Sequence, residues 1–436
     1  MSKRCLPALP CLRNLLEMRD LLANLSWRGL CHDATPGLSD RLERGPIVAY
    51  VGFDPTARSL QLGNLVPVML LTHLQRAGGT PIILMGGGTG MIGDPSGKQT
   101  ERPLLTADEI DRNVTTQRRQ LERFLDFTGS NAARLLNNAD WLRPLRLVDF
   151  LRDTGKHFTV SYMLQKESVK TRLDSGISYA EFSYMLLQAY DFLQLYRTEG
   201  CELQMGGSDQ WGNITAGVEL IRRAAAGDAH GLSAPLITKA SGAKFGKTEE
   251  GSIWLDPELT SPYAFLQFWI NTDDADVEAF LKRFTLRSSE QIAAVMERHR
   301  ANPAAREAQH ELALDVTTRV HGTLVTQRAV NASRILFGQS DLGSADRETW
   351  EMLSNELRSW TTSRQQFPRP IVDIVAESGL TASKGDARRQ LQQGGISLNG
   401  TRVGVDATVT LDGLLADRYL WLRRGKKTDL IVKVDP

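Results

Sequence analysis

Along the first half of the chain, short apolar runs alternate with segments whose apolar residues recur every three to four positions. This pattern predicts strands that alternate with helices. Val48–Phe53 and residues 81–85 are short apolar runs bounded by turn-forming residues, which is typical of buried strands. Between them, residues 63–75 carry apolar side chains every three to four positions, which predicts a helix. This order predicts an α/β fold with a parallel sheet covered by helices. Such sheets bind ligands at the carboxyl ends of their strands.

The same periodicities divide the rest of the chain. We expect helices over residues 18–27, 106–127, 181–196 and 213–225, and a short strand over 203–205. From residue 262 to residue 358 helical patterns dominate and glycine is rare, which indicates a separate helical unit. The polar, proline-containing segment 361–370 reads as a linker, and mixed α/β patterns follow it. The predicted divisions are residues 1–17, 18–258, 259–360, 361–370 and 371–436.

The first 17 residues show no periodic apolar face that could dock on a body. They are too polar for a secretory signal, and they lack the Arg- and Ser-rich character of a transit peptide. We therefore expect a disordered extension, or a start codon assigned upstream of a true start at Met18.

Composition narrows the class of protein. The chain has 436 residues, of which 41% are hydrophobic and 24% charged, as in ordinary globular proteins. Apolar runs such as residues 82–85 are far shorter than the ~20 residues that a membrane span needs, so we expect no membrane partner. The four cysteines show no CxxC spacing, which argues against a disulfide framework or a zinc site. A reducing, cytoplasmic location is expected.

Charge is distributed unevenly along a nearly neutral chain. Residues 367–436 carry 11 Lys and Arg against 8 Asp and Glu, whereas the rest of the chain is slightly acidic. A basic tail indicates a polyanionic partner such as nucleic acid. The alternative, a solvated charged surface, remains open on charge alone.

Two glycine-containing segments follow the predicted strands. In GFDPTARSLQLGN, residues 52–64, a helix begins near Gly63, and backbone N–H groups at a helix start favour phosphate. Gly63 also leaves room for a nucleobase. In GGGTGMIGDPSGK, residues 86–98, Asp94 can bind an ammonium group, and Lys98 with the nearby Arg102 can bind a triphosphate. A packing glycine and a solvated surface turn are the alternatives.

Three further segments carry polar groups at spacings that indicate a site. Tyr184, Gln188 and Asp191 lie four and three residues apart, so one face of an otherwise apolar helix is polar. The alternative is a hydrogen-bonded helix surface. GGSDQWGN places two polar residues after a glycine-marked strand end, and KFGKT places two lysines around a glycine, where they can stabilise charge on a leaving phosphate. The two polar residues are Asp209 and Gln210, and the lysines are Lys244 and Lys247, followed by Thr248.

Taken in this order, the five segments resemble those of bacterial-type tyrosyl-tRNA synthetases, which are class I aminoacyl-tRNA synthetases. The resemblance runs from about Met18 to the end of the chain. The last segment, with SKGDARRQLQQGGISLNG, resembles a small RNA-binding domain shared with a ribosomal protein. Its basic residues Lys384, Arg388 and Arg389 are candidate phosphate contacts for tRNA.

The resemblance implies a role for each matching residue. Tyr50 and Asp191 hold the phenol of tyrosine, and Asp94, Tyr184 and Gln188 hold its ammonium group. Trp141, in the segment NNADW, supports the pocket. The residues along the adenylate are Asp54, Gly63, Asp209 and Gln210. The residues around the triphosphate are Thr56, Lys98, Arg102, Lys244, Lys247 and Thr248, and Gln61 and Asn64 of the first segment are further catalytic residues.

It also implies an architecture and a reaction. The expected order is a Rossmann-like catalytic domain, a helical anticodon-binding domain and a small α/β RNA-binding domain. The implied substrates are L-tyrosine, ATP and tRNA(Tyr), with Mg²⁺ entering with ATP and with no metal site in the protein. A homodimer is implied as well.

One residue departs from the family pattern. The class I signature begins with histidine, whereas this chain has Gln61 followed by Leu62, Gly63 and Asn64. Glutamine can donate a hydrogen bond to a phosphate oxygen but cannot become cationic. We expect activity to survive, because the lysines and Thr56 share the charge. Two alternatives stay open: a class I synthetase for tryptophan or another amino acid, and a synthetase-like RNA-binding protein without catalysis.

Overall fold

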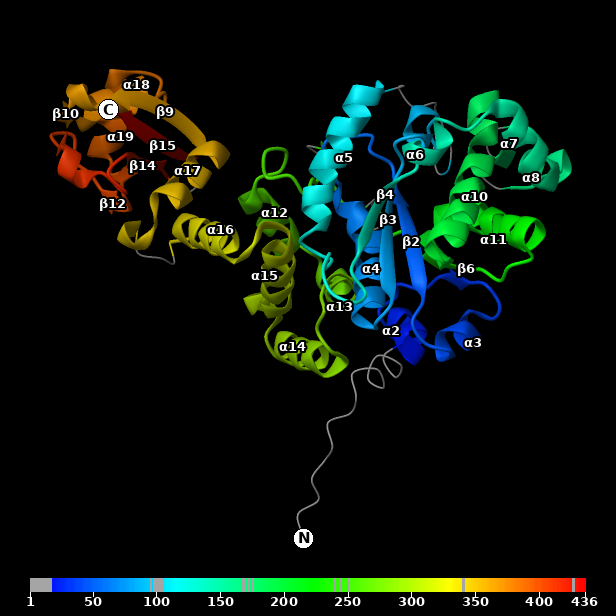
Figure 1. Ribbon diagram of the computed structural model, residues 1–436. Helices are drawn as coiled ribbons and strands as arrows, with labels where there is room; N and C mark the ends of the chain where they lie inside the picture. The colour runs from blue at the N-terminus through cyan, green and yellow to red at the C-terminus, as the bar shows by residue number, and fades with distance from the viewer. Residues whose placement is uncertain are drawn as a thin grey trace, which may run out of the picture. The chain divides into compact units, whose positions relative to one another are not determined.

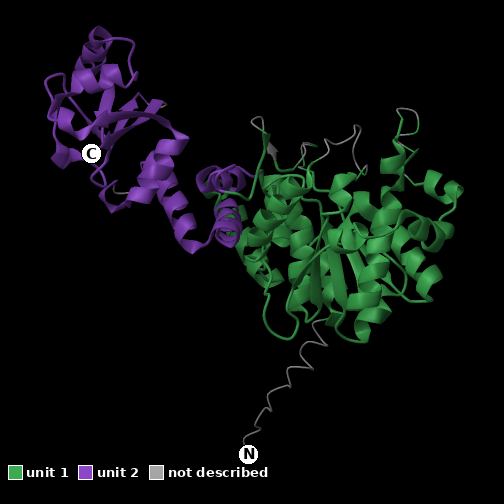
Figure 2. Cartoon of the chain, turned by 45° about the horizontal axis from the view of Figure 1, so that its top comes forward, with its two compact units in different colours: residues 1–256, 273–308 green, residues 257–272, 309–436 purple. Residues whose placement is uncertain are grey.

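The structure is a computed structural model that describes residues 18–94, 96, 105–166, 169–170, 173, 176–238, 240, 242, 245–248, 251–338, 342–425 and 428–436. The predicted extension, residues 1–17, lies outside the described residues. The chain divides into two compact units, drawn in green and purple in Figure 2. Unit 1 reaches Asp256 and also contains Asp273–Ala308, and unit 2 contains Pro257–Thr272 and Gln309–Pro436.

Unit 1 is built on a six-stranded sheet with the order β1-β6-β5-β2-β3-β4 (Figure 1). The strands are β1 Asp33–Ala34, β2 Val48–Phe53, β3 Thr80–Met85, β4 Arg134–Asn137, β5 Cys201–Gly207 and β6 His230–Ala234. The five strands from β6 to β4 are parallel, and β1 pairs antiparallel with β6. The predicted parallel sheet with a Rossmann-like core is therefore confirmed.

Helices cover the sheet because alternate strand residues are apolar on each face. Helix α4, Leu65–Arg76, packs on β2, β3 and β5, and its other side meets α2, Leu21–Trp27. Tyr50, Ile82 and Leu84 instead belong to a core with α10 and α11. The remaining helices of this region are α3 Leu38–Glu43, α5 Ala107–Leu121, α6 Ala139–Leu142, α7 Leu147–Asp153, α8 Val160–Leu164, α10 Tyr179–Glu199 and α11 Trp211–Ala225.

The direction of the chain changes beside β2, and this creates a crevice. The chain leaves β2 through α4 to β3 on one side, whereas β5 lies on the other side of β2. In a parallel sheet such a reversal separates the loops at the carboxyl ends of the two neighbouring strands. These loops begin at Asp54 after β2 and at Ser208 after β5, and both carry predicted site residues.

Helices α13, Asp274–Phe284, and α14, Ser289–Ala301, pack with unit 1. The buried guanidinium of Arg28 donates to three carbonyl oxygens at the end of α13, at distances of 2.8, 2.9 and 2.8 Å. These carbonyls belong to Lys282, Thr285 and Arg287. Unit 1 therefore includes two helices of the predicted helical domain, residues 259–360, and the functional domain boundaries stay a prediction.

Unit 2 combines helices with a second sheet. Its helices include α12 Pro262–Ile270, most of α15 Glu307–His321, α16 Thr323–Leu336, α17 Arg347–Glu356, α18 Ile371–Glu377 and α19 Lys384–Gln392. The sheet has the order β12-β11-β14-β15-β9. Its strands are β9 Arg358–Ser363, β11 Ile396–Leu398, β12 Thr401–Arg402, β14 Tyr419–Arg424 and β15 Thr428–Asp435. A two-stranded pair, β10 Arg369–Pro370 with β13 Thr408–Val409, completes the unit.

Segment 361–370, predicted as a linker, contains regular structure. Residues 361–363 complete β9, which pairs parallel with β15 at the edge of the sheet. A core of aromatic and aliphatic side chains continues from the helices into this sheet. It joins Trp350 and Leu353 of α17 to Tyr419, Trp421 and Ile431. We call this group the shared core of unit 2.

None of the described helices combines the length and apolar character needed to cross a bilayer.

Candidate active site

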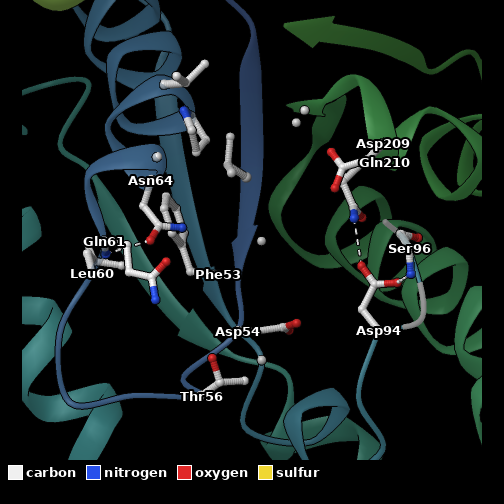
Figure 3. Close-up of a pocket in the computed structure, with 18 of the residues that line it drawn as sticks. Phe53, Asp54, Thr56, Leu60, Gln61, Asn64, Asp94, Ser96, Asp209 and Gln210 are labelled. Carbon is white, nitrogen blue, oxygen red and sulfur yellow. Dashed lines mark hydrogen bonds between the residues drawn. The ribbon is translucent and has the colours of Figure 1, made fainter. Parts of the chain in front are cut away.

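A pocket of about 880 Å³ opens at the carboxyl ends of β2, β3 and β5 (Figure 3). Twelve of the predicted site residues line it, although they come from segments far apart in the sequence. They are Tyr50, Asp54, Thr56, Gln61, Gly63, Asn64, Asp94, Tyr184, Gln188, Asp191, Asp209 and Gln210. Thr56, Gln61 and Asn64 lie on one side of the pocket, and Asp94, Asp209 and Gln210 lie on the other (Figure 3).

The pocket contains a buried phenol, that of Tyr50. Tyr50 points from the middle of β2 and is only 1% exposed, and its ring packs against Phe192 of α10. Among the described residues its hydroxyl has no hydrogen-bond partner. Burial, and then the nearby Asp191 carboxylate, raise the pKa of the Tyr50 phenol well above its usual value, so the hydroxyl keeps its proton. A buried hydroxyl of this kind is satisfied when a ligand completes the site.

Asp191 lies beside Tyr50 and is held by two donors. Asn138 Nδ2 donates to Oδ2 at 2.8 Å, and Trp141 Nε1 donates to Oδ1 at 2.7 Å. The carboxyl is 2% exposed, and burial raises its pKa from 3.8 to about 7, while these two hydrogen bonds act in the opposite direction. Asp191 is therefore an acceptor in a fixed orientation, with lone pairs left for a ligand hydroxyl.

Amide side chains and a second buried carboxylate form the middle of the pocket. Gln210 Nε2 donates to Asp94 Oδ2 at 2.7 Å, and Gln188 Nε2 contacts Gln210 Oε1 at 3.3 Å. Asn213 Nδ2 donates to Gln188 Oε1 at 2.9 Å, which fixes the orientation of that amide. The other oxygen of Asp94 accepts from the backbone N–H of Ser96 at 2.9 Å. Carboxylate and amide oxygens in one place form a cradle for a cation such as an ammonium group.

Tyr184 connects the middle of the pocket with Asp54. Its hydroxyl donates to Asp54 Oδ1 at 3.4 Å, from a ring that is 5% exposed. Burial, followed by the carboxylates of Asp54, Asp94 and Asp191, raises the pKa of this phenol well above its usual value. Tyr184 therefore stays neutral beside three acids and serves as a donor.

The outer side of the pocket is the start of a helix. The backbone N–H of Gln61 donates to Asn64 Oδ1 at 2.8 Å, and the N–H of Asn64 donates to the carbonyl of Gln61 at 2.9 Å. This turn leads into α4, whose N-terminus carries partial positive charge. Gln61 and Gly63 are exposed to the pocket, and a Cβ at Gly63 would meet no atom within 4 Å. A large ligand can therefore approach this backbone closely.

The KFGKT segment is attached to the same turn by backbone hydrogen bonds. Ile253 N–H donates to the carbonyl of Gly246 at 2.9 Å, and Leu62 N–H donates to the carbonyl of Ile253 at 2.9 Å. Gly246 has φ +74, which favours glycine at this position. Lys247–Thr248 form β7, which pairs with β8, Gly251–Ser252. The Lys247 and Thr248 side chains, and all of Lys98, Arg102 and Lys244, lie outside the described part of the structure.

Sequence comparisons identify the family. The family model described as "tRNA synthetases class I (W and Y)" matches residues 42–338, and the model of the "Tyrosine--tRNA ligase SYY-like C-terminal domain" matches residues 351–432. A tyrosine–tRNA ligase from Anaeromyxobacter dehalogenans is 57% identical over 96% of this chain and 100% of its own length. The chain belongs to the tyrosine–tRNA ligase family. A second relative with the same name, from Roseiflexus castenholzii, is 49% identical over 94% of this chain and 98% of its own.

Solved structures agree with this assignment to the tyrosine–tRNA ligase family. A C-terminally truncated mitochondrial tyrosyl-tRNA synthetase from Aspergillus nidulans superposes with a TM-score of 0.67. It is 29% identical and covers 74% of this chain and 98% of its own. The resemblance recognised in the sequence motifs is thereby confirmed, whereas the roles of individual residues stay predictions.

Some pocket residues were not predicted from sequence. Asn138 was overlooked although it stands three positions before Trp141, a spacing that places both on one side of a helical turn. Asn213, at the end of GGSDQWGN, does not line the pocket but holds Gln188, and it was not predicted either. Gln204 lines the pocket with a buried Oε1 that has no partner among the described residues. Its signal was a polar residue in the middle of an apolar strand.

The predicted tRNA contacts lie in unit 2, on α19. Lys384 Nζ forms an ion pair with Asp373 at 2.7 Å, and Arg389 forms one with Asp386 at 2.5 Å. Exposed pairs of this kind contribute little free energy, so a phosphate can replace the carboxylate at small cost. Arg388 lies between them on the same helix.

Proposed function

We propose that the chain activates L-tyrosine with ATP and transfers the tyrosyl group to the terminal ribose of tRNA(Tyr), releasing AMP and pyrophosphate. The observation that carries this proposal is the buried hydroxyl of Tyr50, which has no partner in the described part of the chain and lies beside the fixed acceptor Asp191. A substrate phenol can accept a hydrogen bond from Tyr50 and donate one to Asp191, so one ligand group satisfies both. The names of the relatives at 49–57% identity support the same substrate.

A tryptophan substrate is the second candidate, because the matching family model covers both the W and Y enzymes. The indole N–H can donate to Asp191 but has no lone pair that could accept from Tyr50. Tryptophan would leave the Tyr50 hydroxyl buried and unpaired, which costs free energy. The pocket therefore favours a phenol.

The rest of the amino acid is bound by the middle of the pocket. The substrate ammonium group lies near Asp94, with the Gln188 Oε1 and the Tyr184 hydroxyl as further contacts. Asn213 supports this arrangement because its Nδ2 donates to Gln188 Oε1 and fixes that amide, while the oxygen keeps a second lone pair for the ammonium group. The carboxylate of tyrosine then points toward the outer side of the pocket, where ATP binds.

In the first step, the tyrosine carboxylate attacks the α-phosphate of ATP and the bond to pyrophosphate breaks. Negative charge moves onto the leaving pyrophosphate, and donors aimed at that position stabilise the transition state. We assign this role to Thr56, Gln61 and Asn64, together with Lys98, Arg102, Lys244, Lys247 and Thr248 of the neighbouring segments. Asp54, Gly63, Asp209 and Gln210 line the path of the adenylate. No side chain forms a covalent bond with substrate, so positioning and electrostatics account for catalysis.

Magnesium enters with ATP, as part of that substrate. Within the described ranges of the chain, no group of three or more His, Cys, Asp or Glu residues is placed to hold a metal ion. The Mg²⁺ ligands are then mainly the phosphate oxygens of ATP. We propose a cytoplasmic site of action, where ATP and tRNA are supplied.

In the second step, the terminal ribose hydroxyl of tRNA attacks the activated carbonyl, and AMP leaves. We propose that α19 binds tRNA phosphates through Lys384, Arg388 and Arg389. The match of residues 351–432 to the C-terminal domain of tyrosine–tRNA ligases supports a role for this region in the same enzyme.

We propose that the protein is a homodimer. Apolar side chains on α7, on α8 and at the start of α10 are exposed, although such surfaces are normally covered. Leu147 and Val148 are 70% and 74% exposed, Val160 is 63% exposed and Tyr179 is 77% exposed. Analytical ultracentrifugation of the natural chain should give twice the monomer mass, and Val148→Asp should shift the mass toward the monomer. A monomeric natural chain would contradict this assignment.

The test of the main proposal is ATP–pyrophosphate exchange with each amino acid in turn, followed by tRNA charging. We expect exchange with tyrosine alone and transfer of tyrosine to tRNA(Tyr). Exchange with tryptophan would assign the second candidate. No exchange with any amino acid would indicate an RNA-binding protein that has lost catalysis.

A further inference from the structure

Helix α5 carries three amide side chains that face one loop of the active site. Asn113, Gln117 and Gln120 are four and three residues apart, which places them on one side of the helix. The loop runs from Pro55 to Leu60, between β2 and the turn that leads into α4. It contains Thr56 and ends one residue before Gln61.

The three amides bind groups along the whole length of this loop. Asn113 Nδ2 donates to the carbonyl of Pro55 at 2.9 Å, and Gln117 Nε2 donates to the carbonyl of Ala57 at 2.8 Å. Gln120 Oε1 accepts from the N–H of Leu60 at 2.9 Å, and its Nε2 donates to Ser59 Oγ at 3.0 Å. The bound groups thus flank Thr56 on both sides and precede Gln61 directly.

The loop depends on these contacts for its shape. Residues 54–60 are all described, and they form neither helix nor strand. A segment without regular structure keeps one conformation only if its backbone groups are bound by something else. Transition-state donors must be held within a fraction of an ångström, because small misplacements lower the rate steeply.

The hydrogen bond from Gln117 to the Ala57 carbonyl fixes the loop but contributes little to the stability of the fold. The Gln117 side chain is 2% exposed and lines the pocket, and its Oε1 is buried without a partner among the described residues. A buried amide with half of its hydrogen-bonding capacity unused adds little to stability. An apolar side chain of the same length would serve the core equally well, but it could not hold the Ala57 carbonyl.

We propose that Gln117 and Gln120 are positioning residues for adenylate formation, which orient Thr56 and Gln61 toward the leaving phosphates of ATP. This inference rests on the proposed function. Gln117 acts on Thr56 through Ala57, and Gln120 acts on Gln61 through Leu60. Neither amide needs to touch the substrate.

The variants are Gln117→Met and Gln120→Met, which keep the length of the side chain and remove the amide. Thr115→Ala is the control on the same helix, because the exposed Thr115 hydroxyl donates within α5 to the carbonyl of Asp111. Pre-steady-state adenylate formation should slow by about 2- to 12-fold in Gln117→Met, the factor for one lost hydrogen bond, and by at least as much in Gln120→Met, which loses two. The tyrosine dissociation constant and the melting temperature should stay close to those of the natural chain, and Thr115→Ala should change none of these quantities.

A double-mutant comparison separates positioning from a general structural effect. In a Thr56→Ala background, Gln117→Met should slow the reaction much less than in the natural chain, because the group that it positions is already absent. Gln120→Met should show the same dependence on Gln61→Ala. The proposal would be overturned if the rate factors of the two single variants simply multiplied in the double variant. Normal rates in both methionine variants would also overturn it. So would a fall in melting temperature large enough to leave much of the variant unfolded at the assay temperature.

The same measurements keep this inference apart from the proposed function. Absence of tyrosine-dependent exchange in the natural chain would refute the function itself. Normal exchange in the natural chain together with unaffected variants would refute only the role of the α5 amides.

Discussion

Replacing Trp141 with phenylalanine should raise the pKa of the Asp191 carboxyl. Tyrosine should then bind weakly up to a higher pH than in the natural chain. The substitution removes the Nε1–H that donates to Asp191 Oδ1 at 2.7 Å and keeps an aromatic ring in place. This hydrogen bond stabilises the ionised carboxylate, so its loss favours the protonated form. The protonated carboxyl is a poorer acceptor for the substrate phenol, and tyrosine affinity should therefore follow the ionised fraction.

The magnitude follows from the strength of one charge-assisted hydrogen bond. Such a bond contributes about 1.5–3 kcal/mol, and about 1.4 kcal/mol corresponds to one pKa unit. The pKa of Asp191, about 7 in the natural chain, should thus rise by about one to two units. At pH 7 the ionised fraction should fall from about a half to about a tenth or less, which raises the KM for tyrosine about fivefold for one unit and about 50-fold for two.

The assay is the KM for tyrosine in ATP–pyrophosphate exchange, at saturating ATP and across the range from about pH 6 to pH 8.5. The natural chain and Trp141→Phe should differ most at low pH and approach each other at high pH. Leu136→Ala is the control, because it removes apolar volume beside the same core cluster without removing a donor. Identical pH profiles for the natural chain and Trp141→Phe would show that Asp191 does not bind the phenol as an ionised acceptor.

Three further predictions follow from the site and the tail. Gln61→Ala should slow adenylate formation about 5- to 30-fold while tyrosine affinity stays normal, and Gln61→His should be at least as fast as the natural chain; an unchanged rate in Gln61→Ala would exclude a contact in the transition state. Asp191→Ala should weaken tyrosine use sharply and narrow the discrimination against phenylalanine, which tyrosyl-tRNA synthetases reject by roughly 10⁵-fold; a folded variant with unchanged discrimination would remove Asp191 from the pocket. Replacing Lys384, Arg388 and Arg389 together with glutamine should reduce the slope of log Kd for tRNA against log salt by about 0.7–0.9 per lost phosphate contact, and tyrosine-dependent exchange should not change; an unaltered slope would place the tRNA contacts elsewhere.

Much of the site could be predicted because its residues stand at positions with a clear signal. Asp54 follows a buried strand directly, and Tyr184, Gln188 and Asp191 interrupt an apolar helix at helical spacing. Glycines at the strand ends marked the loops that meet where the chain changes direction beside β2. These signals lie in short stretches of sequence, so the pocket residues could be predicted without knowledge of the distant contacts in the fold.

The groups that support the site have weaker signals. Asn113, Gln117 and Gln120 share a helical face, yet a polar face on a polar helix is equally typical of a solvated surface. Their targets are mainly backbone atoms, which are present in every residue and leave no mark in the sequence. The contact of Arg28 with α13 was invisible for the same reason, since it also binds carbonyl oxygens.

Strand β9 was not predicted, because strand formation there depends on a distant partner. Apart from Trp360, the residues of β9 are polar and show no alternation, and their hydrogen bonds come from β15, near the end of the chain. An edge strand can be polar, because only one of its sides is paired and much of it meets solvent. Local sequence therefore could not distinguish this strand from an irregular connection.

The shared core of unit 2 determines how this part of the protein unfolds. Trp350 and Trp421 belong to one cluster, so the last sheet cannot separate from α17 without exposing both indole rings. Regions that share a core unfold as one cooperative unit, and their amide protons exchange with solvent at the same free energy of opening. The amides of α17 and β15 should therefore be protected equally. The basic helix α19 is carried by this unit, and any loss of tRNA binding on heating should coincide with the melting of the helices that precede it.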